Sequence, residues 1–251
     1  MSPGVVGRDA ELASVREFVS SIPAGAVVLA LEGDAGVGKT TLWEACLEEA
    51  DDRGIRVLAA RSAESETALS FSGIGDLLDH VLDEALAPLP AAQKRALTRA
   101  LVLGEDEGPP PDPHAIGLAL LNSLRALAAG APIVLAVDDV QWLDPASAGG
   151  LAFAARRLRD ERVGVLLSRR SGLESTLLSE LRRGLSLNRV TNLDVGPLEA
   201  GALHDVIQAQ LGVVLSRPRL EELHEASGGN PFYALEIVRT LQRSGVSVDA
   251  G

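Results

Sequence analysis

The sequence contains the stretch Gly33-Asp34-Ala35-Gly36-Val37-Gly38-Lys39-Thr40-Thr41, which fits the pattern GxxxxGK(S/T). A short apolar run at residues 27–31 precedes it, and apolar residues at helical spacing follow it. Glycines between a strand and a helix allow successive backbone N–H groups to point at a phosphate, and the first turn of the helix adds the positive end of its dipole. The stretch therefore predicts a loop that binds the phosphates of a nucleotide.

The residues expected to bind the nucleotide through this loop are Gly33, Ala35, Gly36, Val37, Gly38, Lys39, Thr40 and Thr41. Lys39 would place its charge at the β- and γ-phosphates and so contribute to catalysis. The Thr40 hydroxyl would ligate Mg²⁺, which takes few protein ligands and keeps most of its water. The alternative is a glycine-rich turn that binds nothing, which the flanking strand and helix disfavour.

A second informative stretch ends in two acids. Residues 133–137 are consecutive apolar residues, and Asp138 and Asp139 follow them directly. This pattern predicts a strand buried on both faces whose acids emerge at the edge where open α/β sheets bind ligands. In a P-loop enzyme, Asp138 would hold Mg²⁺ through water together with Thr40, and Asp139 would orient or deprotonate an attacking water. The alternative is an exposed acidic turn.

The composition restricts the class of protein. A chain of 251 residues with 46% hydrophobic but only 3% aromatic residues has the aliphatic side chains for one large domain, or for one domain and a small appendage. The formal net charge of −12 argues against a broad surface that binds nucleic acid. Cys46 is the single cysteine, so no intrachain disulfide is expected. Since no leader or membrane span is apparent, we expect a cytoplasmic protein without membrane contact.

The order of the predicted elements defines the fold class. Further strands are predicted at residues 55–60, 163–169 and 189–193, with helices between them. The strand at residues 163–169 ends in a polar residue, Ser168, and an arginine. From Glu199 onward only helical patterns follow. We therefore predict an α/β fold, a P-loop NTPase three-layer αβα core with a mostly parallel sheet at residues 1–194. A small helical lid domain at residues 195–251 would follow it.

Three local features complete the predicted organisation. Asp9 precedes apolar residues at helical spacing, which predicts that it caps the first helix. Residues 71–86 have the pattern of one amphipathic helix. Residues 104–113 combine acids with prolines and are expected to form a surface loop.

Three stretches together resemble the nucleotide-binding domain of STAND-type, AAA-like signalling ATPases: Val6-Gly7-Arg8, the loop from Gly33 to Thr41, and Asp138-Asp139-Val140-Gln141-Trp142-Leu143-Asp144. The chain most resembles the N-terminal module of large ATP-binding LuxR-type transcriptional regulators. The resemblance extends over roughly residues 5–243. It implies ATP or ADP and Mg²⁺ as cofactors.

The resemblance also implies roles for residues outside the two main motifs. Val6, Gly7 and Arg8 would lie near the base and its sugar. Arg169 would be the catalytic sensor-1 arginine near the γ-phosphate, with Arg170 as the alternative alignment. Pro231, in the turn Gly228-Gly229-Asn230-Pro231, would lie against the adenine.

The residues alone leave other interpretations open for these positions. Arg169 follows a buried strand and needs an anionic partner there, which a phosphate or a salt bridge to Asp139 or Asp144 would supply. The turn that contains Pro231 also fits a plain helix end, with asparagine and proline starting the next helix.

The resulting hypothesis is an ATP-binding, slowly ATP-hydrolysing switch module of a transcriptional regulator. Slow turnover is expected because no arginine finger is identifiable and an Asp reaches less far than a Glu. One alternative is a nucleotide-binding scaffold without turnover. The other is a small-molecule P-loop kinase, which would need a lid rich in arginine, whereas residues 199–227 contain only Arg217 and Arg219.

The expected partners follow from the same resemblance. The regulators continue into further domains that include a C-terminal helix-turn-helix, whereas no such motif with basic recognition residues occurs in this sequence. We therefore expect ATP as ligand, contacts with C-terminal regulatory domains or self-association, and no direct binding of nucleic acid by this chain.

Overall fold

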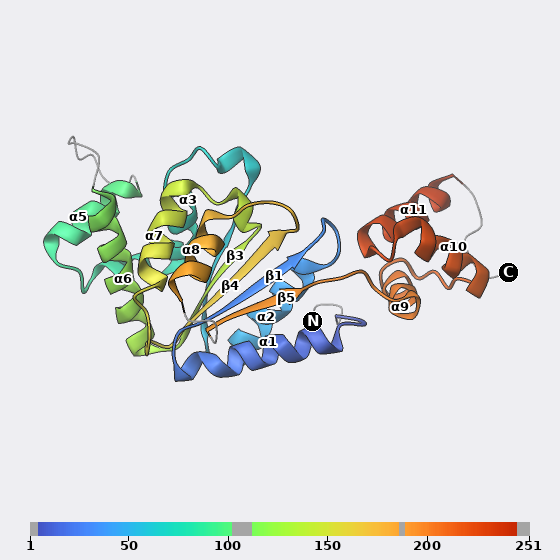
Figure 1. The fold of residues 1–251 in the computed structure, drawn as a ribbon, viewed down its shortest axis with the longest axis horizontal. Helices are drawn as coiled ribbons and strands as arrows, with labels where there is room; N and C mark the ends of the chain where they lie inside the picture. The colour runs from blue at the N-terminus through green and yellow to red at the C-terminus, as the bar shows by residue number, and fades with distance from the viewer. Residues whose placement is uncertain (1–4, 102–111, 186–188, 245–251) are drawn as a thin grey trace.

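The structure, a computed structural model of the chain, describes residues 5–101, 112–185 and 189–244. It has a larger α/β core and a smaller group of helices toward the C-terminus (Figure 1). Most of the predicted surface loop at residues 104–113 lies outside the described residues, and helix α6 (Pro113–Gly130) begins at its last residue.

The described part of the core contains a sheet of five parallel strands in the order β2-β3-β4-β1-β5. The strands are β1 (Val27–Gly33), β2 (Arg56–Arg61), β3 (Ile133–Asp138), β4 (Val163–Arg170) and β5 (Val190–Asp194). The central strands are rich in Val, Leu and Ala, and every residue of β3 is buried, as a parallel sheet covered on both faces requires. The predicted α/β P-loop NTPase fold is confirmed.

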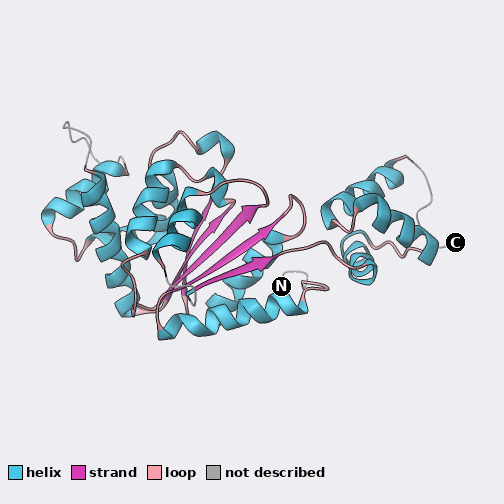
Figure 2. Cartoon of the chain, in the orientation of Figure 1, coloured by secondary structure: helices cyan, strands magenta, loops and turns pink. Residues whose placement is uncertain are grey.

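Helices cover both faces of the sheet, as Figure 2 shows. One face carries α1 (Asp9–Ser21) and α2 (Lys39–Asp52). The other face carries α3 (Ser72–Leu78), α4 (Leu82–Leu86), α5 (Ala91–Ala100), α6, α7 (Pro145–Ala155) and α8 (Thr176–Gly184). We call these the α2 face and the α7 face. Because side chains alternate along a strand, β1 sends Leu29 and Leu31 to the α2 face and Val28 and Ala30 to the α7 face.

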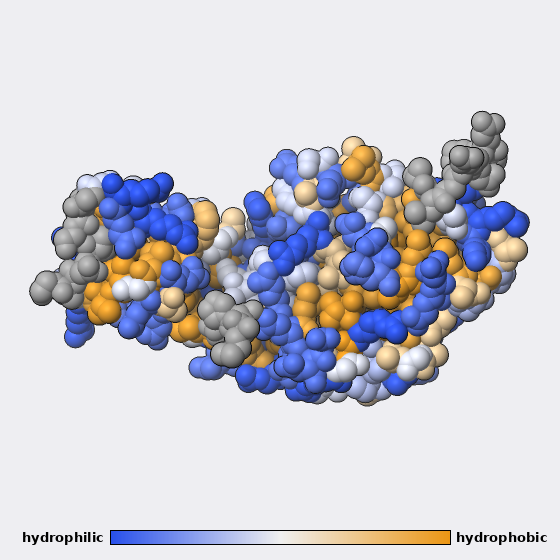
Figure 3. Space-filling view, turned by 180° about the vertical axis from the view of Figure 1, so that it is seen from behind, coloured by the Kyte–Doolittle hydropathy of each residue, from blue (hydrophilic) through white to orange (hydrophobic). Residues whose placement is uncertain are grey.

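The C-terminal helical unit consists of α9 (Ala200–Leu211), α10 (Arg217–Ser227) and α11 (Pro231–Arg243). It has an apolar core of its own, in which Leu203, Ile207 and Val238 are fully buried. The space-filling view shows this unit joined to the larger core through a narrower region (Figure 3). Its helices therefore do not contribute to the two cores that cover the sheet.

Two local predictions were wrong. Arg8, not Asp9, occupies the N-cap position of α1, and its side chain makes no cap bond. Asp9 lies in the first turn, where its carboxylate faces the positive end of the helix dipole.

The helix predicted at residues 71–86 is broken into α3 and α4 by a 3-10 turn, Asp79–Val81. The break allows α3 to pack on β2 and α7 while α4 packs on α6, so the apolar residues of both pieces enter the same core. Among the described residues, none of the helices combines the length with the apolar character that a membrane span requires.

Asp144 links α3 to α7. Its carboxylate is 1% exposed and caps α7 by accepting a hydrogen bond from the Ser147 N–H at 2.8 Å. It also accepts the N–H groups of Phe71 (2.8 Å) and Gly73 (3.2 Å) at the start of α3. Since an ionised acceptor makes stronger hydrogen bonds than a neutral one, this carboxylate determines how the two helices meet.

Replacing this carboxylate is expected to destabilise the core. Asp144→Ala leaves three N–H groups without their acceptor, two of them buried and one part-buried, so the free energy of unfolding should fall by about 3 kcal/mol. Urea denaturation followed by the fluorescence of the buried Trp43 measures this loss. Asp160→Ala, at an exposed turn of the core, is the matched control and should change the free energy of unfolding by less than about 0.5 kcal/mol. Equal effects of the two substitutions would contradict the assignment.

Candidate functional site

The candidate site lies at the edge of the sheet where β1, β3 and β4 end. The loop at residues 33–38 leaves β1 and leads directly into α2, which begins at Lys39. Gly36 and Gly38 have φ values of +77° and +107°, which residues with a side chain rarely adopt. The glycines therefore allow the chain to curl between the end of the strand and the positive end of the helix dipole.

Lys39 is folded back on the loop. Its ammonium group donates hydrogen bonds to the carbonyl oxygens of Gly33 (3.0 Å) and Asp34 (2.8 Å), and the residue is 6% exposed. Burial lowers the pKa of Lys39, and the carboxylates of Asp139, Asp138 and Asp34 act in the opposite direction. A group held by two neutral carbonyls can exchange them for the anionic oxygens of a phosphate, which bind an ammonium more strongly.

Thr40 and Asp138 are hydrogen-bonded to each other. The Thr40 hydroxyl donates to Asp138 Oδ2 at 3.2 Å. Hydroxyl and carboxylate oxygens are the donors that Mg²⁺ takes, so the pair fits a site in which Thr40 would ligate this ion and Asp138 would hold it through water. The described residues contain no cluster of three His, Cys, Asp or Glu side chains suited to a metal. The remaining ligands of a bound Mg²⁺ would then be waters and phosphate oxygens.

Ser168, a buried residue two positions before the end of β4, contacts the acids at the end of β3. Its hydroxyl donates a short hydrogen bond to Asp138 Oδ1 and accepts one from the Asp139 N–H at 2.8 Å. Asp138 is thus held on both carboxylate oxygens, by Ser168 and by Thr40. Sequence reasoning recognised Ser168 only as a polar residue at the end of a strand, because a hydrogen bond between two strands leaves no signal in either of them.

Asp139 has an unusual backbone conformation. Its φ of +50° lies in the left-handed region, which Asp tolerates better than most residues. The carboxylate accepts a hydrogen bond from Gln141 Nε2 at 2.7 Å, and its Oδ1 atom lies 3.7 Å from Arg170 Nε. The side chain predicted to act on a water is therefore engaged by two neighbours.

The two arginines that end β4 point to opposite faces of the sheet. Arg170 lies on the α2 face together with Asp138 and Ser168, and its charge contributes to lowering the pKa of Lys39. Arg169 lies on the α7 face beside Glu32, its neighbour in the register of β1 and β4. The structure thus brings Arg170, and not Arg169, to the group around Lys39. A role of Arg169 at the γ-phosphate stays a prediction without support from this geometry.

Glu32 is the anionic partner of Arg169. The Arg169 guanidinium donates to Glu32 Oε2 at 2.5 Å, and Arg182 of α8 binds the other oxygen. The predicted salt bridge of Arg169 to Asp139 or Asp144 is wrong, because the parallel register places Glu32 directly beside it. Burial alone would raise the pKa of Glu32, but the hydrogen bonds from Arg169 and Arg182 outweigh it and hold this pKa below its usual value.

The N-terminal stretch connects the loop to the helical unit. Arg8 is 5% exposed and donates to the carbonyl oxygens of Val37 (2.8 Å) and Gly196 (2.7 Å), and it pairs with Glu11. A Cβ atom on Gly7 would lie 2.2 Å from the Cβ of Ala202 in α9, so only glycine fits there. The half-buried Val6 precedes them. The predicted contacts of these residues with a base and sugar remain predictions.

The turn before α11 also reaches the loop. Asn230 caps α11, and its amide donates to the Ala35 carbonyl at 2.9 Å. Pro231 is the first residue of α11 and is half-buried beside this contact. The turn therefore starts a helix, as expected if it has no ligand, and it also contacts the phosphate loop.

Thr41, the last residue predicted in the phosphate loop, lies exposed in the first turn of α2.

These elements define a class of site. A glycine-rich loop, a lysine at a helix start and acids at a strand end lie together at the start of α2. The sequence matches the family described as the AAA ATPase domain over residues 4–168, and the chain belongs to this family. It matches none of the curated proteins with which it was compared.

Several solved structures share the fold. The Aeropyrum pernix ORC2 protein has a TM-score of 0.58 at 16% identity, covering 100% of this chain and 68% of that protein. The Walker-type ATPase of Pyrococcus abyssi has a TM-score of 0.54 at 16% identity, covering 95% and 68%. DnaA from Aquifex aeolicus has a TM-score of 0.53 at 16% identity, covering 95% and 62%. The chain thus spans about two thirds of these proteins' length, and the similarity supports the fold.

The ion pairs of Glu32 lead to a prediction about pH. Because its pKa is lower in the folded state, Glu32 stabilises the fold above its unfolded pKa, and this contribution is lost as the pH falls through the lowered value. Glu32→Gln should therefore reduce the free energy of unfolding by about 1 kcal/mol at pH 7 and leave it unchanged at low pH. Urea denaturation at both pH values tests this. Glu84→Gln, at an exposed ion pair with Arg56, should have little effect at either.

The opposite faces of the two arginines predict opposite phenotypes. Arg169→Ala should lower the free energy of unfolding by about 1–2 kcal/mol, because it removes a partner of the part-buried Glu32. It should leave the affinity for ATP unchanged. Arg170→Ala should leave stability within about 0.5 kcal/mol but weaken ATP binding or its hydrolysis about tenfold. Calorimetric titration measures the ATP affinity of both variants, and urea denaturation measures their stability. Weaker ATP binding in Arg169→Ala but not in Arg170→Ala would assign Arg169, and not Arg170, to the site.

Proposed function

We propose that this chain binds ATP with Mg²⁺ and hydrolyses it slowly. The observation that carries the proposal is the convergence of Lys39, Thr40, Asp138 and Asp139 at the start of α2. These are the groups that nucleotide hydrolysis needs: a cation for the phosphates, oxygen ligands for Mg²⁺ and a carboxylate near the attacking water. The ORC2 structure is described with ADPNP and ADP and that of DnaA with AMPPCP, which supports ATP and ADP as ligands here.

Each side chain would act on a different part of the nucleotide. Lys39 would move from the loop carbonyls to the β- and γ-phosphates. Thr40 and Asp138 would hold Mg²⁺, which neutralises charge on the phosphate oxygens. Asp139 would orient or deprotonate the attacking water, and Arg170 would place its charge at the γ-phosphate in preference to Arg169. Slow turnover is consistent with the engagement of Asp139 by its neighbours.

The base and sugar would lie between the core and the helical unit. Pro231 would contact the adenine, and Val6, Gly7 and Arg8 would border the base and sugar. Residues 195–251 would act as a lid on the ATP-binding domain at residues 1–194. ATP and ADP would favour different lid positions because they make different contacts with it, which is the condition for a ligand to shift a conformational equilibrium.

The resemblance of the motifs to LuxR-type regulators of the STAND class supports a role as the switch module of a cytoplasmic transcriptional regulator. In such a protein, further regulatory domains or a second copy of the chain would respond to the lid. Nucleic-acid binding would then belong to those domains.

A scaffold that binds nucleotide without turnover is the second candidate. One observation favours it: Asp139 Oδ1 accepts from Gln141 and lies near Arg170, so a movement of this side chain toward an attacking water would break both contacts. A kinase acting on a small molecule is the third, and phosphate transfer to a metabolite instead of water would identify it.

The experiment that tests the proposal measures ATP and ADP binding with Mg²⁺ by calorimetry and phosphate release over hours. Lys39→Ala should weaken ATP binding about 10- to 100-fold, because it removes a charge-assisted contact with the phosphates. Asp139→Asn keeps a residue that tolerates positive φ, and it should bind ATP but release no phosphate. Wild-type turnover should be below ~1 s⁻¹.

Lys94→Ala, at an exposed position of α5, is the matched control and should behave as the wild type. Binding without any phosphate release would identify the scaffold. A wild-type chain that binds no nucleotide would contradict the proposal.

A further inference from the structure

The carbonyl groups of the phosphate loop all have hydrogen-bond donors, and several of these donors come from distant segments. Lys39 binds the carbonyls of Gly33 and Asp34. The next three are bound from outside the loop: Ala35 O by Asn230 Nδ2 at 2.9 Å, Gly36 O by the Phe232 N–H at 3.3 Å, and Val37 O by Arg8 at 2.8 Å. Two of these three donors belong to the start of α11 in the helical unit.

Fixing a carbonyl also fixes the next N–H group. The peptide unit is planar and trans, so the N–H of each residue points away from the carbonyl of the residue before it. With the Ala35, Gly36 and Val37 carbonyls turned toward these donors, the N–H groups of Gly36, Val37 and Gly38 are turned the other way. Among the described residues, the N–H groups of Gly36 and Gly38 donate no hydrogen bond. They are therefore available to an anion in the concavity of the loop.

Asn230 is held rigidly in this position. Its Oδ1 atom accepts the N–H groups of Phe232 (3.1 Å) and Tyr233 (3.4 Å) as the cap of α11, and the residue is 8% exposed. These bonds on the oxygen direct the amide nitrogen toward Ala35. One side chain thus serves both the helix start and the phosphate loop.

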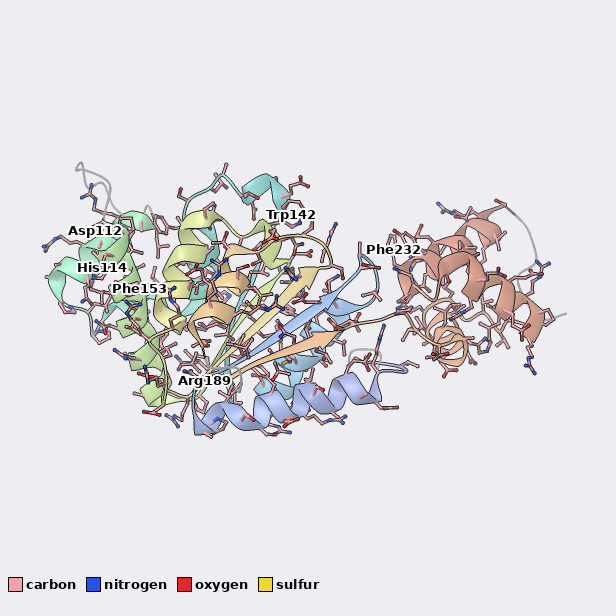
Figure 4. All side chains as sticks on the ribbon, in the orientation of Figure 1. Asp112, His114, Trp142, Phe153, Arg189 and Phe232 are labelled. Carbon is pink, nitrogen blue, oxygen red and sulfur yellow. The ribbon has the colours of Figure 1, made fainter. Side chains whose placement is uncertain are left out.

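The residue type at position 36 independently supports the contact between the start of α11 and the phosphate loop. The pattern GxxxxGK(S/T) requires glycine at positions 33 and 38 but not at 36. A Cβ atom on Gly36 would lie 2.6 Å from Phe232 Cβ and 3.1 Å from Asn230 Oδ1. Figure 4 shows Phe232 on the side of the helical unit that faces the core. The start of α11 therefore approaches the loop so closely that only glycine fits.

We propose that Asn230 is a positioning residue that holds the phosphate loop in its anion-binding shape from the helical unit, so that the affinity for the polyphosphate depends on where this unit lies. The proposal rests on the proposed binding of ATP and deepens it. A displacement of the unit would release the Ala35 and Gly36 carbonyls together, because both donors sit on the same helix start. The adjacent N–H groups would then lose their fixed direction.

Two substitutions separate the cap from the contact with the loop. Asn230→Ser and Asn230→Asp both keep an N-cap of similar strength, but neither supplies the amide donor. We expect the thermal midpoint to change little and the ATP affinity to fall about 3- to 10-fold in Asn230→Ser. The ATP affinity should fall further in Asn230→Asp, because the new carboxylate would face the Ala35 carbonyl and the phosphates and repel both. Asn122→Asp, which replaces a donating amide on α6, is the matched control and should bind ATP as the wild type does.

Inorganic pyrophosphate with Mg²⁺ serves as a second probe, because it contacts the loop but has no base. If Asn230 acts through the loop, Asn230→Ser should lower the affinity for pyrophosphate and the affinity for ATP by the same factor. A loss confined to ATP would mean that the residue acts through the base, as its neighbour Pro231 is expected to, and would overturn the inference.

The outcomes also separate this inference from the function on which it rests. If the wild type binds ATP, Lys39→Ala binds it about 10- to 100-fold more weakly, and both Asn230 variants bind within about twofold of the wild type, the inference fails and the proposed function stands. If the wild type binds neither ATP nor pyrophosphate, both fail.

Discussion

The candidate site depends on the parallel direction of the strands. Parallel strands end at one edge of a sheet, so the loop after β1 meets the acids after β3 and the polar end of β4 although Thr40 and Asp138 are 98 residues apart. The register then selects which side chains take part. Alternation along β4 places Ser168 and Arg170 on the α2 face and Arg169 on the other, and a shift by one residue would exchange the two arginines.

Burial of charge explains why the site is so extensively hydrogen-bonded. Arg8, Lys39 and Asp138 are each 5–6% exposed, and an ionised group without partners is costly at such depth. Backbone carbonyls accept two hydrogen bonds from Arg8 and two from Lys39, whereas the hydroxyls of Thr40 and Ser168 donate to Asp138. Neutral partners leave the net charge of Lys39 available to an anionic ligand, while the network keeps its position defined before the ligand arrives.

The same hydrogen bonds connect the site to the rest of the chain. Arg8 joins the loop to the segment before α9, and Asn230 joins it to the start of α11. The phosphate loop is thus shared between the core and the helical unit, which have separate apolar cores. A loop shared in this way provides a short physical route from phosphate binding to the position of the unit.

Much of the fold and part of the site follow from local sequence. The loop motif, the buried strands and the acids after β3 were predictable because a binding loop and an apolar strand each need particular residues at adjacent positions. The partners of those residues were not. In the pairs Ser168 with Asp138, Glu32 with Arg169, and Asn230 with the Ala35 carbonyl, nothing in the local sequence of one member indicates the other. Only strand register and the packing of the helical unit, which depend on contacts between distant segments, bring the members of each pair together.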